Sequence, residues 1–396
     1  MSRSSLAISW PADAVEISEM EQKTLERYLK DLEMLVNIDS AQDCPEGIMK
    51  VATFFDREFK AIGWKTSFVD VGAVAPCFVA MNREAERYDL YITGHMDTVF
   101  PKGTAAQRPF TIEGNIAKGP GVCDMKQGLL STLYAIRAVD MSILDRLNII
   151  VVFQPDEEIG SPHSRNFLME VADKSDVCLV MEAAEAEDVP VHCIQRKGII
   201  KYSFVFTGKA GHAGSMLTNG SVSAITEMSY WINSIMGLVD KEKETTANVG
   251  LVSGGTATNV VAEHAEMAGE IRFELVEEAA RANRLIESLY AHAKEAGVQV
   301  ERTHTRFDPP MTPNLETKTF VDYLDWLAGE EGRSFIVRKR GGLSAANFIS
   351  SHIAVCVDGM GPSGNGAHGV NEYLCIDSIG PDTDFLSRII CNHLAD

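Results

Sequence analysis

The stretch LNIIVVFQPDEEIGS, residues 147–161, joins an apolar run to three consecutive acidic residues. The run Leu147–Phe153 is typical of a buried strand, and Asp156, Glu157 and Glu158 come close behind it. Adjacent carboxylates repel one another and are costly to remove from water, so positive charge is expected beside them. We therefore predict a pair of metal ions here, with Glu158 as a ligand and Glu157 as the residue that carries a proton.

Strands and helices alternate on both sides of this stretch. Apolar runs predict strands at 65–71, 77–81, 89–93, 147–153 and 177–181, and amphipathic spacing predicts helices within 19–38, 47–62, 125–139 and 165–172. Strands that are apolar along most of their length and interleaved with helices are typical of an α/β layer sandwich around a mostly parallel central sheet.

The pattern changes near residue 196. From 200 to 305 the predicted order is strand, helix, strand, strand, helix, strand, which is typical of a ferredoxin-like α+β module. Helices resume after the prolines at 309, 310 and 313. We therefore predict a catalytic domain of residues 1–195 and 310–396, with a second domain, residues 196–309, inserted into it and a loose arm at 1–18.

Composition restricts the partners and the compartment. The net charge of −20 argues against nucleic acid and against an anionic membrane, because both require a basic face. The eight cysteines include no CxxC pair, so buried reduced thiols are expected. Neither a secretory signal nor an apolar run of membrane-spanning length is present, so we predict a cytoplasmic protein.

A second group of chemical interest is GHMDTV, residues 94–99, which follows the strand ending at Thr93. On an extended segment His95 and Asp97 leave from the same face. Asp97 could accept a proton from one imidazole nitrogen while the other binds a metal. The alternative is a loop histidine that merely pairs with a nearby aspartate.

The segment GPGVCDMK, residues 119–126, places Asp124 immediately before the predicted helix. An aspartate at that position is often only an N-cap. The Gly-Pro-Gly turn before it favours a functional role, because a tightly held turn would aim the carboxylate. Both interpretations stay open from these residues alone.

Three potential ligands follow three predicted strands, namely His95, Glu158 and Glu182. Functional sites in open α/β sheets lie at the carboxyl ends of strands. Three such residues at three strand ends therefore favour a site over ordinary solvent-exposed side chains. Glu185 and Glu187 are rivals to Glu182 but lie further into the loop. His368, within the glycine-rich run GNGAHG at 364–369, is the last candidate; its alternative is an ordinary exposed loop histidine.

Two histidines and three carboxylates exceed what one catalytic zinc with three protein ligands needs, but they suit two metals that share a bridging carboxylate. Asp124 is the natural bridge. The nitrogen and oxygen donors favour two Zn²⁺ per chain, with Mn²⁺ or Co²⁺ as substitutes. A purely structural zinc site is disfavoured because such sites are rich in cysteine.

The motifs GHMDTVFPKG (94–103), GPGVCDMKQG (119–128), DEEIGS (156–161) and TGKAGHAGS (207–215) occur in this order. With them the chain resembles the dinuclear zinc exopeptidases and deacylases that include bacterial glutamate carboxypeptidase, acetylornithine deacetylase, succinyl-diaminopimelate desuccinylase and aminoacylase. The likeness runs from about Leu25 to the C-terminus. It is nearest to the glutamate carboxypeptidase branch, through the run QRKG at 195–198 and the loop 361–373.

This resemblance implies a role for each candidate residue. Asp124 would bridge both metals, His95 and Glu182 would complete one site, and Glu158 and His368 the other. Glu157 would be the general base, and Asp97 would support His95. In the inserted domain, which forms the family's dimer interface, His212 would reach the partner's active site to steady the oxyanion, and Asn259 and Arg272 would hold the substrate carboxylate. Gly342, in the resumed catalytic domain, is a further predicted substrate-binding residue.

The sequence departs from the family pattern at two positions. The family's run Gly-Gly-x-Ser/Thr-Asp-Ala reads GGLSAA at 341–346, so Ala345 stands where an aspartate is common. Gln127 replaces a frequent glycine. No metal ligand is lost, so the change at Ala345 concerns the pocket near the substrate carboxylate.

The expected function is metal-dependent hydrolysis of an amide bond beside a free carboxylate, as in a glutamate-carboxypeptidase-like exopeptidase that releases a C-terminal amino acid from a small peptide or N-acyl amino acid. Alternatives within the enzyme class are an N-acyl-amino-acid deacylase of the acetylornithine deacetylase or aminoacylase type and a di- or tripeptidase. A catalytically inactive binding homologue is the alternative from another class. The complete ligand set together with Glu157 argues against it.

Overall fold

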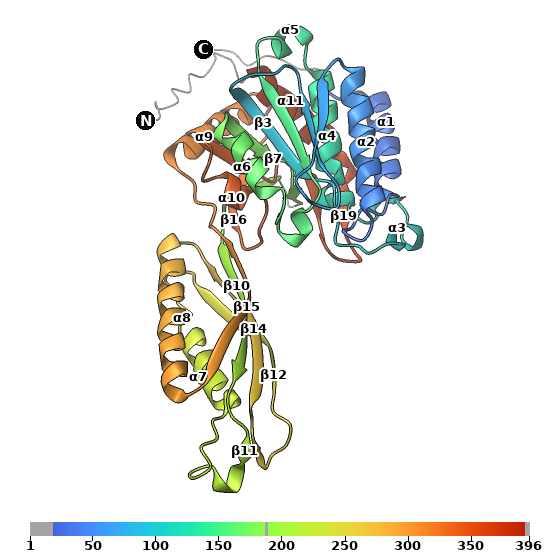
Figure 1. The fold of residues 1–396 in the computed structure, drawn as a ribbon. Helices are drawn as coiled ribbons and strands as arrows, with labels where there is room; N and C mark the ends of the chain where they lie inside the picture. Colours follow the sequence, from blue (N-terminus) through green and yellow to red (C-terminus); the bar gives the residue numbers. More distant parts are fainter. Residues whose placement is uncertain (1–18, 187–188, 393–396) are drawn as a thin grey trace. The chain divides into compact units, whose positions relative to one another are not determined.

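The computed structural model describes residues 19–186 and 189–392, which form two compact units (Figure 1). The first unit contains the described residues up to Gln195, Pro313–Arg340 and those from Ser344 onward. The second contains Arg196–Thr312 and Gly341–Leu343. The glycine pair belongs to the second unit because its carbonyls accept hydrogen bonds from that unit's arginines: Arg272 Nη1 bonds Gly341 O at 2.7 Å and Arg196 Nη1 bonds Gly342 O at 3.0 Å. The arm expected at 1–18 lies outside the described residues.

A large mixed sheet organises the first unit. Its central strands are parallel neighbours in the order β6 (Ile149–Gln154), β3 (Tyr88–His95), β7 (Ser175–Val180) and β17 (Val355–Asp358). Beyond β6 lie the antiparallel strands β2 (Cys77–Met81) and β1 (Lys65–Val69). Beyond β17 follow β9 (Val191–Arg196), β8 (Ala183–Glu185), β18 (Gly361–Asn365), β19 (Tyr373–Cys375), β5 (Ile116–Lys118) and β4 (Thr111–Glu113), with β16 (Ile336–Arg340) paired to β9.

The α/β class predicted from the sequence is confirmed, but the parallel pairing is concentrated at the centre of the sheet. Parallel neighbours need a long crossover, and helices supply it between the central strands. The short outer strands are mostly antiparallel, as in β1–β2, β18–β19 and β4–β5, because their connections are too brief for a helical crossover.

The first unit also contains helices, most of which pack on this sheet. They are α1 (Gln22–Val36), α2 (Pro45–Ala61), α3 (Thr104–Gln107), α4 (Gln127–Ala138), α5 (Met141–Leu144), α6 (Arg165–Asp173), α9 (Leu315–Gly329), α10 (Ala346–Ile349) and α11 (Ile376–Asn392). Helical spacing brings the apolar residues of α1, such as Tyr28, Leu32 and Leu35, onto one buried stripe. The sheet and these stripes share one hydrophobic core, which removes the central strands from water.

The second unit has the predicted ferredoxin-like order. Its antiparallel sheet runs β12 (Thr246–Gly254), β14 (His264–Phe273), β10 (Gly198–Thr207) and β15 (Gln299–Asp308), with α7 (Ala224–Met236) and α8 (Val276–Ala296) packed on it. Phe204, Phe206 and Trp231 lie at the centre of its own core. A short ribbon, β11 (Gly211–His212) with β13 (Val260–Val261), extends from the sheet.

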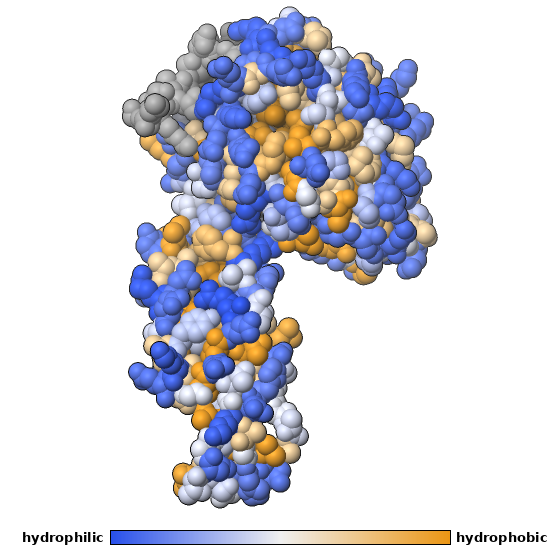
Figure 2. All heavy atoms as spheres, viewed as in Figure 1, coloured by the Kyte–Doolittle hydropathy of each residue, from blue (hydrophilic) through white to orange (hydrophobic). Residues whose placement is uncertain are grey.

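The surface of the second unit also carries apolar side chains, visible among the hydrophilic residues in Figure 2. Leu217 is fully exposed, and Leu251 and Val252 on the edge strand β12 are 72% and 59% exposed. An edge strand with exposed apolar residues is a common pairing surface.

The cysteines and helices bear on two further expectations. All eight cysteines are free thiols, and all but Cys375 are buried. Among the described residues, no helix combines the length and the apolar composition that crossing a membrane would require.

Candidate metal centre

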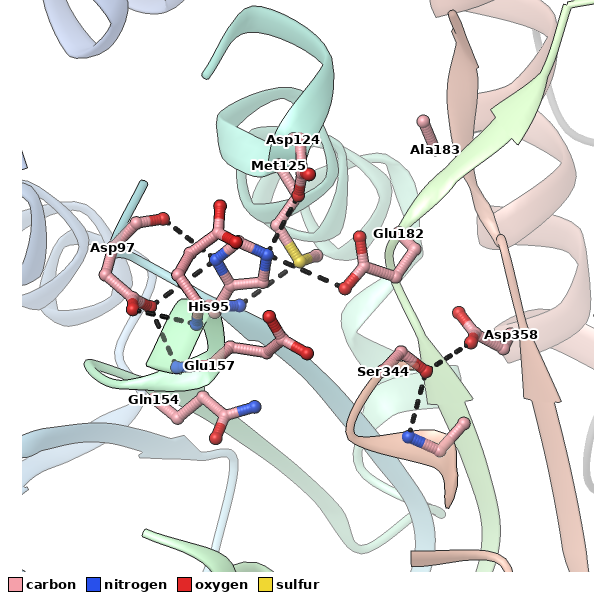
Figure 3. A network of polar contacts seen from close by, with 12 residues as sticks. His95, Asp97, Asp124, Met125, Gln154, Glu157, Glu182, Ala183, Ser344 and Asp358 are labelled. Carbon is pink, nitrogen blue, oxygen red and sulfur yellow. Dashed lines mark hydrogen bonds and ion pairs between the residues drawn. The ribbon is translucent and has the colours of Figure 1, made fainter. Parts of the chain in front are cut away.

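The carboxyl ends of three neighbouring parallel strands bring the predicted ligands together. His95 is the last residue of β3, Glu158 lies in the short turn Glu157–Ile159 after β6, and Glu182 follows β7. Backbone bonds continue the pairing past the strand ends, from Met96 N to Gln154 O at 2.8 Å and from Met181 N to Thr93 O at 2.9 Å. Figure 3 shows His95 at the centre of a polar network, with Asp97 on one side and Asp124 and Glu182 on the other.

Asp124 does not cap a helix, so that interpretation was wrong. The predicted helix start at residue 125 is replaced by a wide turn, Val122–Lys126, and α4 begins only at Gln127 with Lys126 at the N-cap. The Asp124 carboxylate is therefore available to the histidines. Its Oδ1 lies 3.0 Å from His95 Nε2 and its Oδ2 lies 3.1 Å from His368 Nε2. One carboxylate thus faces both imidazoles, as a bridging ligand must.

Glu158 and Glu182 extend this arrangement in two directions. Glu158 Oε2 lies 3.0 Å from His368 Nε2, and Glu182 Oε1 lies 3.6 Å from His95 Nε2. The side chains therefore form two groups that share Asp124. Of the rivals to Glu182, Glu185 lies on β8 and Glu187 lies outside the described residues.

The donors fit metal ions in chemistry as well as position. Ligand atoms of His95, Asp124 and Glu158 lie within 4.8 Å of one another. Glu158 Oε1 is buried and has no hydrogen-bond partner among the described residues, a costly state for a carboxylate oxygen unless a cation faces it. Imidazole nitrogens with carboxylate oxygens suit Zn²⁺ and related dications.

Asp97 supports the site in a way that spacing alone did not reveal. Its backbone oxygen lies 2.9 Å from His95 Nδ1, nearer than its Oδ1 at 3.5 Å. The carboxylate instead accepts the backbone N–H groups of Glu157 and Glu158, both at 3.1 Å, and a bond from Gln42 Nε2 at 2.9 Å. Asp97 therefore ties the acidic turn to the end of β3.

Asp156, the first residue of the acidic run, accepts hydrogen bonds from the backbone and from one side chain of the following loop. Asp156 is fully buried and accepts bonds from His163 N at 2.9 Å, Ser164 N at 3.2 Å and Ser164 Oγ. These contacts hold the turn that leads into α6. The hydrogen bonds of Asp156 therefore hold the loop, and its neighbours remain free for chemistry.

The charged groups of the centre shift one another's pKa strongly. Burial raises the pKa of Glu157 to about 8 and raises the pKa of Glu182 well above its usual range. Burial also opposes ionisation of Asp124, but hydrogen bonds from His368 and His95 outweigh it and lower the pKa of that carboxyl. The bond to Asp124, with that to Glu158, raises the pKa of His368 to about 11. A cluster with this surplus of carboxyl groups favours a dication.

The substrate-binding residues expected in the second unit lie at opposite ends of its sheet. His212 and Asn259 are neighbours, since Ala213 N donates to Asn259 O at 3.0 Å. Arg272 lies opposite Ile199 near the start of β10, and it bonds Glu270 Oε1 at 2.8 Å and the Gly341 carbonyl. From Ile199 to Thr207, beside the ribbon that carries His212, β10 spans roughly 26 Å at the usual strand rise.

Glu372 is a residue of the centre to which no role was assigned from the sequence. Its buried carboxylate accepts the N–H groups of Gly121, Cys123 and Asp124. The only feature of the sequence that could have indicated a role for Glu372 is its position four residues after His368. That spacing gives no indication of contacts with residues some 250 positions earlier. Ala345, the departure from the family pattern, is buried and stands at the N-cap of α10.

The class of protein follows from where these side chains lie. Ligand-type residues at the carboxyl ends of parallel strands, beside a carboxyl group of raised pKa, are what a metal-dependent hydrolase requires. Comparison with known proteins narrows this class. The model of peptidase family M20/M25/M40 matches residues 91–392, and the chain belongs to this family.

Individual relatives agree with this assignment. Carboxypeptidase G2 from Pseudomonas sp. (strain RS-16) is 30% identical over 368 residues, covering 91% of this chain and 88% of the relative. Succinyl-diaminopimelate desuccinylase from Ehrlichia canis is 27% identical over 321 residues, covering 76% and 81%. The structure of aminopeptidase PepT from Bacillus cereus matches with a TM-score of 0.74 at 23% identity, covering 93% of this chain and 98% of that one, a likeness of fold alone.

Proposed function

We propose that the protein is a dinuclear metallo-carboxypeptidase that cleaves an amide bond beside a free carboxylate and releases a C-terminal amino acid. The observation that carries this proposal is the Asp124 carboxylate, which faces His95 through one oxygen and His368 through the other. The 30% identity with carboxypeptidase G2 supports the carboxypeptidase reaction over the other activities in the family. The eight free thiols suit a reducing compartment such as the cytoplasm.

The residues of the centre divide the reaction between them. Two Zn²⁺ held by His95, Asp124, Glu158, Glu182 and His368 would supply a water of lowered pKa and would polarise the substrate carbonyl. Glu157 would take the proton from the attacking water and deliver it to the departing amine. In the metal-free chain burial raises the pKa of Glu157, so its carboxylate is a stronger proton acceptor there than an exposed glutamate would be. Asp97 keeps Glu157 in place through the backbone of the acidic turn.

Arg272 is proposed to hold the substrate carboxylate. A guanidinium can bind a carboxylate through two parallel hydrogen bonds, which selects for a free α-carboxyl group. In the structure Arg272 bonds Glu270 and the Gly341 carbonyl, so its side chain is already fixed in direction beside the Gly341–Gly342 run. Gly342 of the same chain and Asn259 of the partner chain are proposed to complete the binding of substrate, because Asn259 lies beside His212 and far from Arg272 along β10.

The function is tested with a matched set of substrates. N-acyl-glutamate, N-acetyl-ornithine and simple dipeptides are assayed, each beside a form whose α-carboxylate is blocked as an amide. We expect hydrolysis of N-acyl-glutamate, and a loss of roughly 30-fold or more in kcat/KM when the carboxylate is blocked, because a charged partner is left unpaired. A chelator should abolish activity, and Zn²⁺ should restore it.

The outcomes separate the alternatives. A preference for N-acetyl-ornithine would assign a deacylase, and a preference for unblocked dipeptides a dipeptidase. Equal rates with free and blocked carboxylates would contradict the role of Arg272. No hydrolysis of any amide, with little bound metal, would assign a binding protein that has lost catalysis.

We further propose that two chains form a dimer through the second unit and that His212 serves the partner's centre, where it stabilises the oxyanion. The roughly 26 Å spanned by β10 within one unit supports this, because a small substrate cannot touch Arg272 and His212 of the same chain. The exposed apolar residues of the edge strand β12 offer a surface for pairing.

A mixing experiment tests this exchange. Glu157→Gln and His212→Ala chains are each expected to be nearly inactive, but a mixed dimer contains one centre that is intact in both respects. After unfolding and refolding an equal mixture, about one quarter of wild-type activity should return if chains pair at random. Mixing Glu157→Gln with Asp124→Ala is the control and should recover none, because each change damages the centre of its own chain and a mixed dimer then has no intact centre. Activity in the mixture of Glu157→Gln with Asp124→Ala, or no activity in the mixture of Glu157→Gln with His212→Ala, would contradict the proposal that His212 serves the partner's centre.

A further inference from the structure

Glu372 receives an unusual number of backbone hydrogen bonds. Its side chain is 2% exposed, and Oε1 accepts Cys123 N at 2.8 Å and Asp124 N at 3.0 Å, while Oε2 accepts Gly121 N at 3.1 Å. Burying a carboxylate is costly unless several donors face it, and here three do. Both oxygens are occupied by the backbone of the Asp124 loop.

The Asp124 loop needs such an acceptor. The N–H groups at the start of a helical turn have no acceptor within the turn, and those of Cys123 and Asp124 stand at that position. Gly121 has a φ of +75°, and a Cβ there would lie 2.7 Å from a methyl group of Thr98. The turn is therefore tightly confined, and the N–H groups of Gly121, Cys123 and Asp124 converge on Glu372.

The loop on the other side carries His368. It connects β18 to β19, whose residue Leu374 pairs with Gly364 and with Ala117. His368 has a φ of +65°, a left-handed conformation that is uncommon for a residue with a side chain and persists only where the surroundings impose it. Glu372 closes this loop, and its own backbone N–H donates to Gly369 O at 3.4 Å.

We propose that Glu372 is a positioning residue that fastens the loop of Asp124 to the loop of His368, so that the two side chains reach the shared site as one rigid unit. This inference rests on the proposed metal centre. Glu372 acts through Asp124, because its oxygens bond the backbone that sets the direction of that carboxylate. The ligand geometry of the centre depends on a residue that is not itself a ligand.

A graded series of variants follows from the contacts. Glu372→Gln keeps the length and one carbonyl oxygen, which can still accept Cys123 N and Asp124 N, but it turns an amide N–H toward Gly121 N. Glu372→Ala removes all three acceptors. We expect metal affinity to fall by about 10-fold in the glutamine variant and by up to about 100-fold in the alanine variant, the usual range for residues that orient ligands. Glu330→Gln, an exposed glutamate on the same unit, is the matched control.

Three measurements are made on the full chain. Hydrogen exchange of the metal-free protein reports the Gly121, Cys123 and Asp124 amides directly, without reference to any metal. Titration with Zn²⁺ gives affinity and stoichiometry. The visible absorption of Co²⁺-loaded protein reports ligand geometry, which a general loss of stability would leave unchanged in the bound fraction.

The expected result is faster exchange at both loops, weaker Zn²⁺ binding in the order wild type, Gln, Ala, and an altered Co²⁺ spectrum. Unchanged exchange would overturn the fastening of the loops. Faster hydrogen exchange in the Glu372 variants, with unchanged Zn²⁺ affinity and an unchanged Co²⁺ spectrum, would show that Glu372 does not position the metal ligands. If the wild type bound no metal, the proposed function would fail, and the exchange measurement alone would then decide whether Glu372 fastens the loops.

Discussion

Replacing Glu157 by glutamine is expected to lower kcat by about 10²–10⁴-fold, the usual contribution of general acid–base catalysis, while metal content stays at the wild-type level. Glutamine has the same shape but cannot take a proton from water at neutral pH. The backbone N–H of residue 157 still bonds Asp97, so the acidic turn should keep its form. Metal analysis and steady-state kinetics on the same sample measure both effects.

The same variant has a second signature in the metal-free protein. Burial raises the pKa of Glu157 to about 8, so the folded chain keeps this carboxyl protonated where the unfolded chain ionises it. Wild-type stability should therefore fall as pH rises from about 4.5 to 8, and Glu157→Gln should escape that part of the loss. Denaturant unfolding at several pH values measures the difference between the two proteins.

The control is Glu170→Gln, which changes an exposed glutamate on α6. It should match the wild type in activity and in stability at every pH. Full activity in Glu157→Gln would show that Glu157 is not the general base. A loss of metal in that variant would instead make residue 157 a ligand.

Replacing Asp124 by alanine is expected to abolish binding of both metals and to reduce kcat/KM by at least about 10⁴-fold, because water without a metal returns from a pKa near 7 to one near 16. The size of the effect follows from the geometry. Asp124 is the one carboxylate in this cluster that faces both His95 and His368, so no half of the centre remains complete without it. Metal stoichiometry after dialysis at fixed free Zn²⁺ is the decisive measurement.

Two variants that keep Asp124 provide the comparison, one at a proposed ligand of a single metal and one outside the proposed ligand set. Glu182→Gln touches only the group around His95 and should leave the metal bound by Asp124, Glu158 and His368. Glu185→Gln, on β8, should leave both metals in place. Retention of both metals by Asp124→Ala would show that the two groups do not share a ligand.

Local sequence patterns were sufficient for the class of fold and for the place of the centre. Apolar runs near β3, β6 and β7 predicted buried strands, and the polar residues after them predicted a site where those strands end. Alternation and helical spacing also predicted the ferredoxin-like order of the second unit. Such periodicities arise from which residues of one segment must leave water, and they can therefore be read from that segment alone.

The helix start near Asp124 shows where local patterns fail. An aspartate before an apolar helical run reads equally as an N-cap and as a ligand, because both uses demand the same residue at the same position. The wide turn at Val122–Lys126 delays α4 and releases the carboxylate. That turn is held by acceptors on Glu372, which comes some 250 residues later in the chain.

Sequence patterns alone were thus enough to predict an α/β unit, a ferredoxin-like second unit and a family-specific set of candidate ligands. The contacts of the folded chain were needed to show that Asp124 faces both histidines, that Asp97 holds the acidic turn, and that Glu372 bonds the loop of Asp124. The tertiary structure also placed Arg272 and His212 at opposite ends of one sheet. The difference lies in the separation along the sequence. Periodic burial depends on residues that are neighbours in one segment. The direction of a buried carboxylate is set by hydrogen bonds from distant segments, which come within reach only in the folded chain.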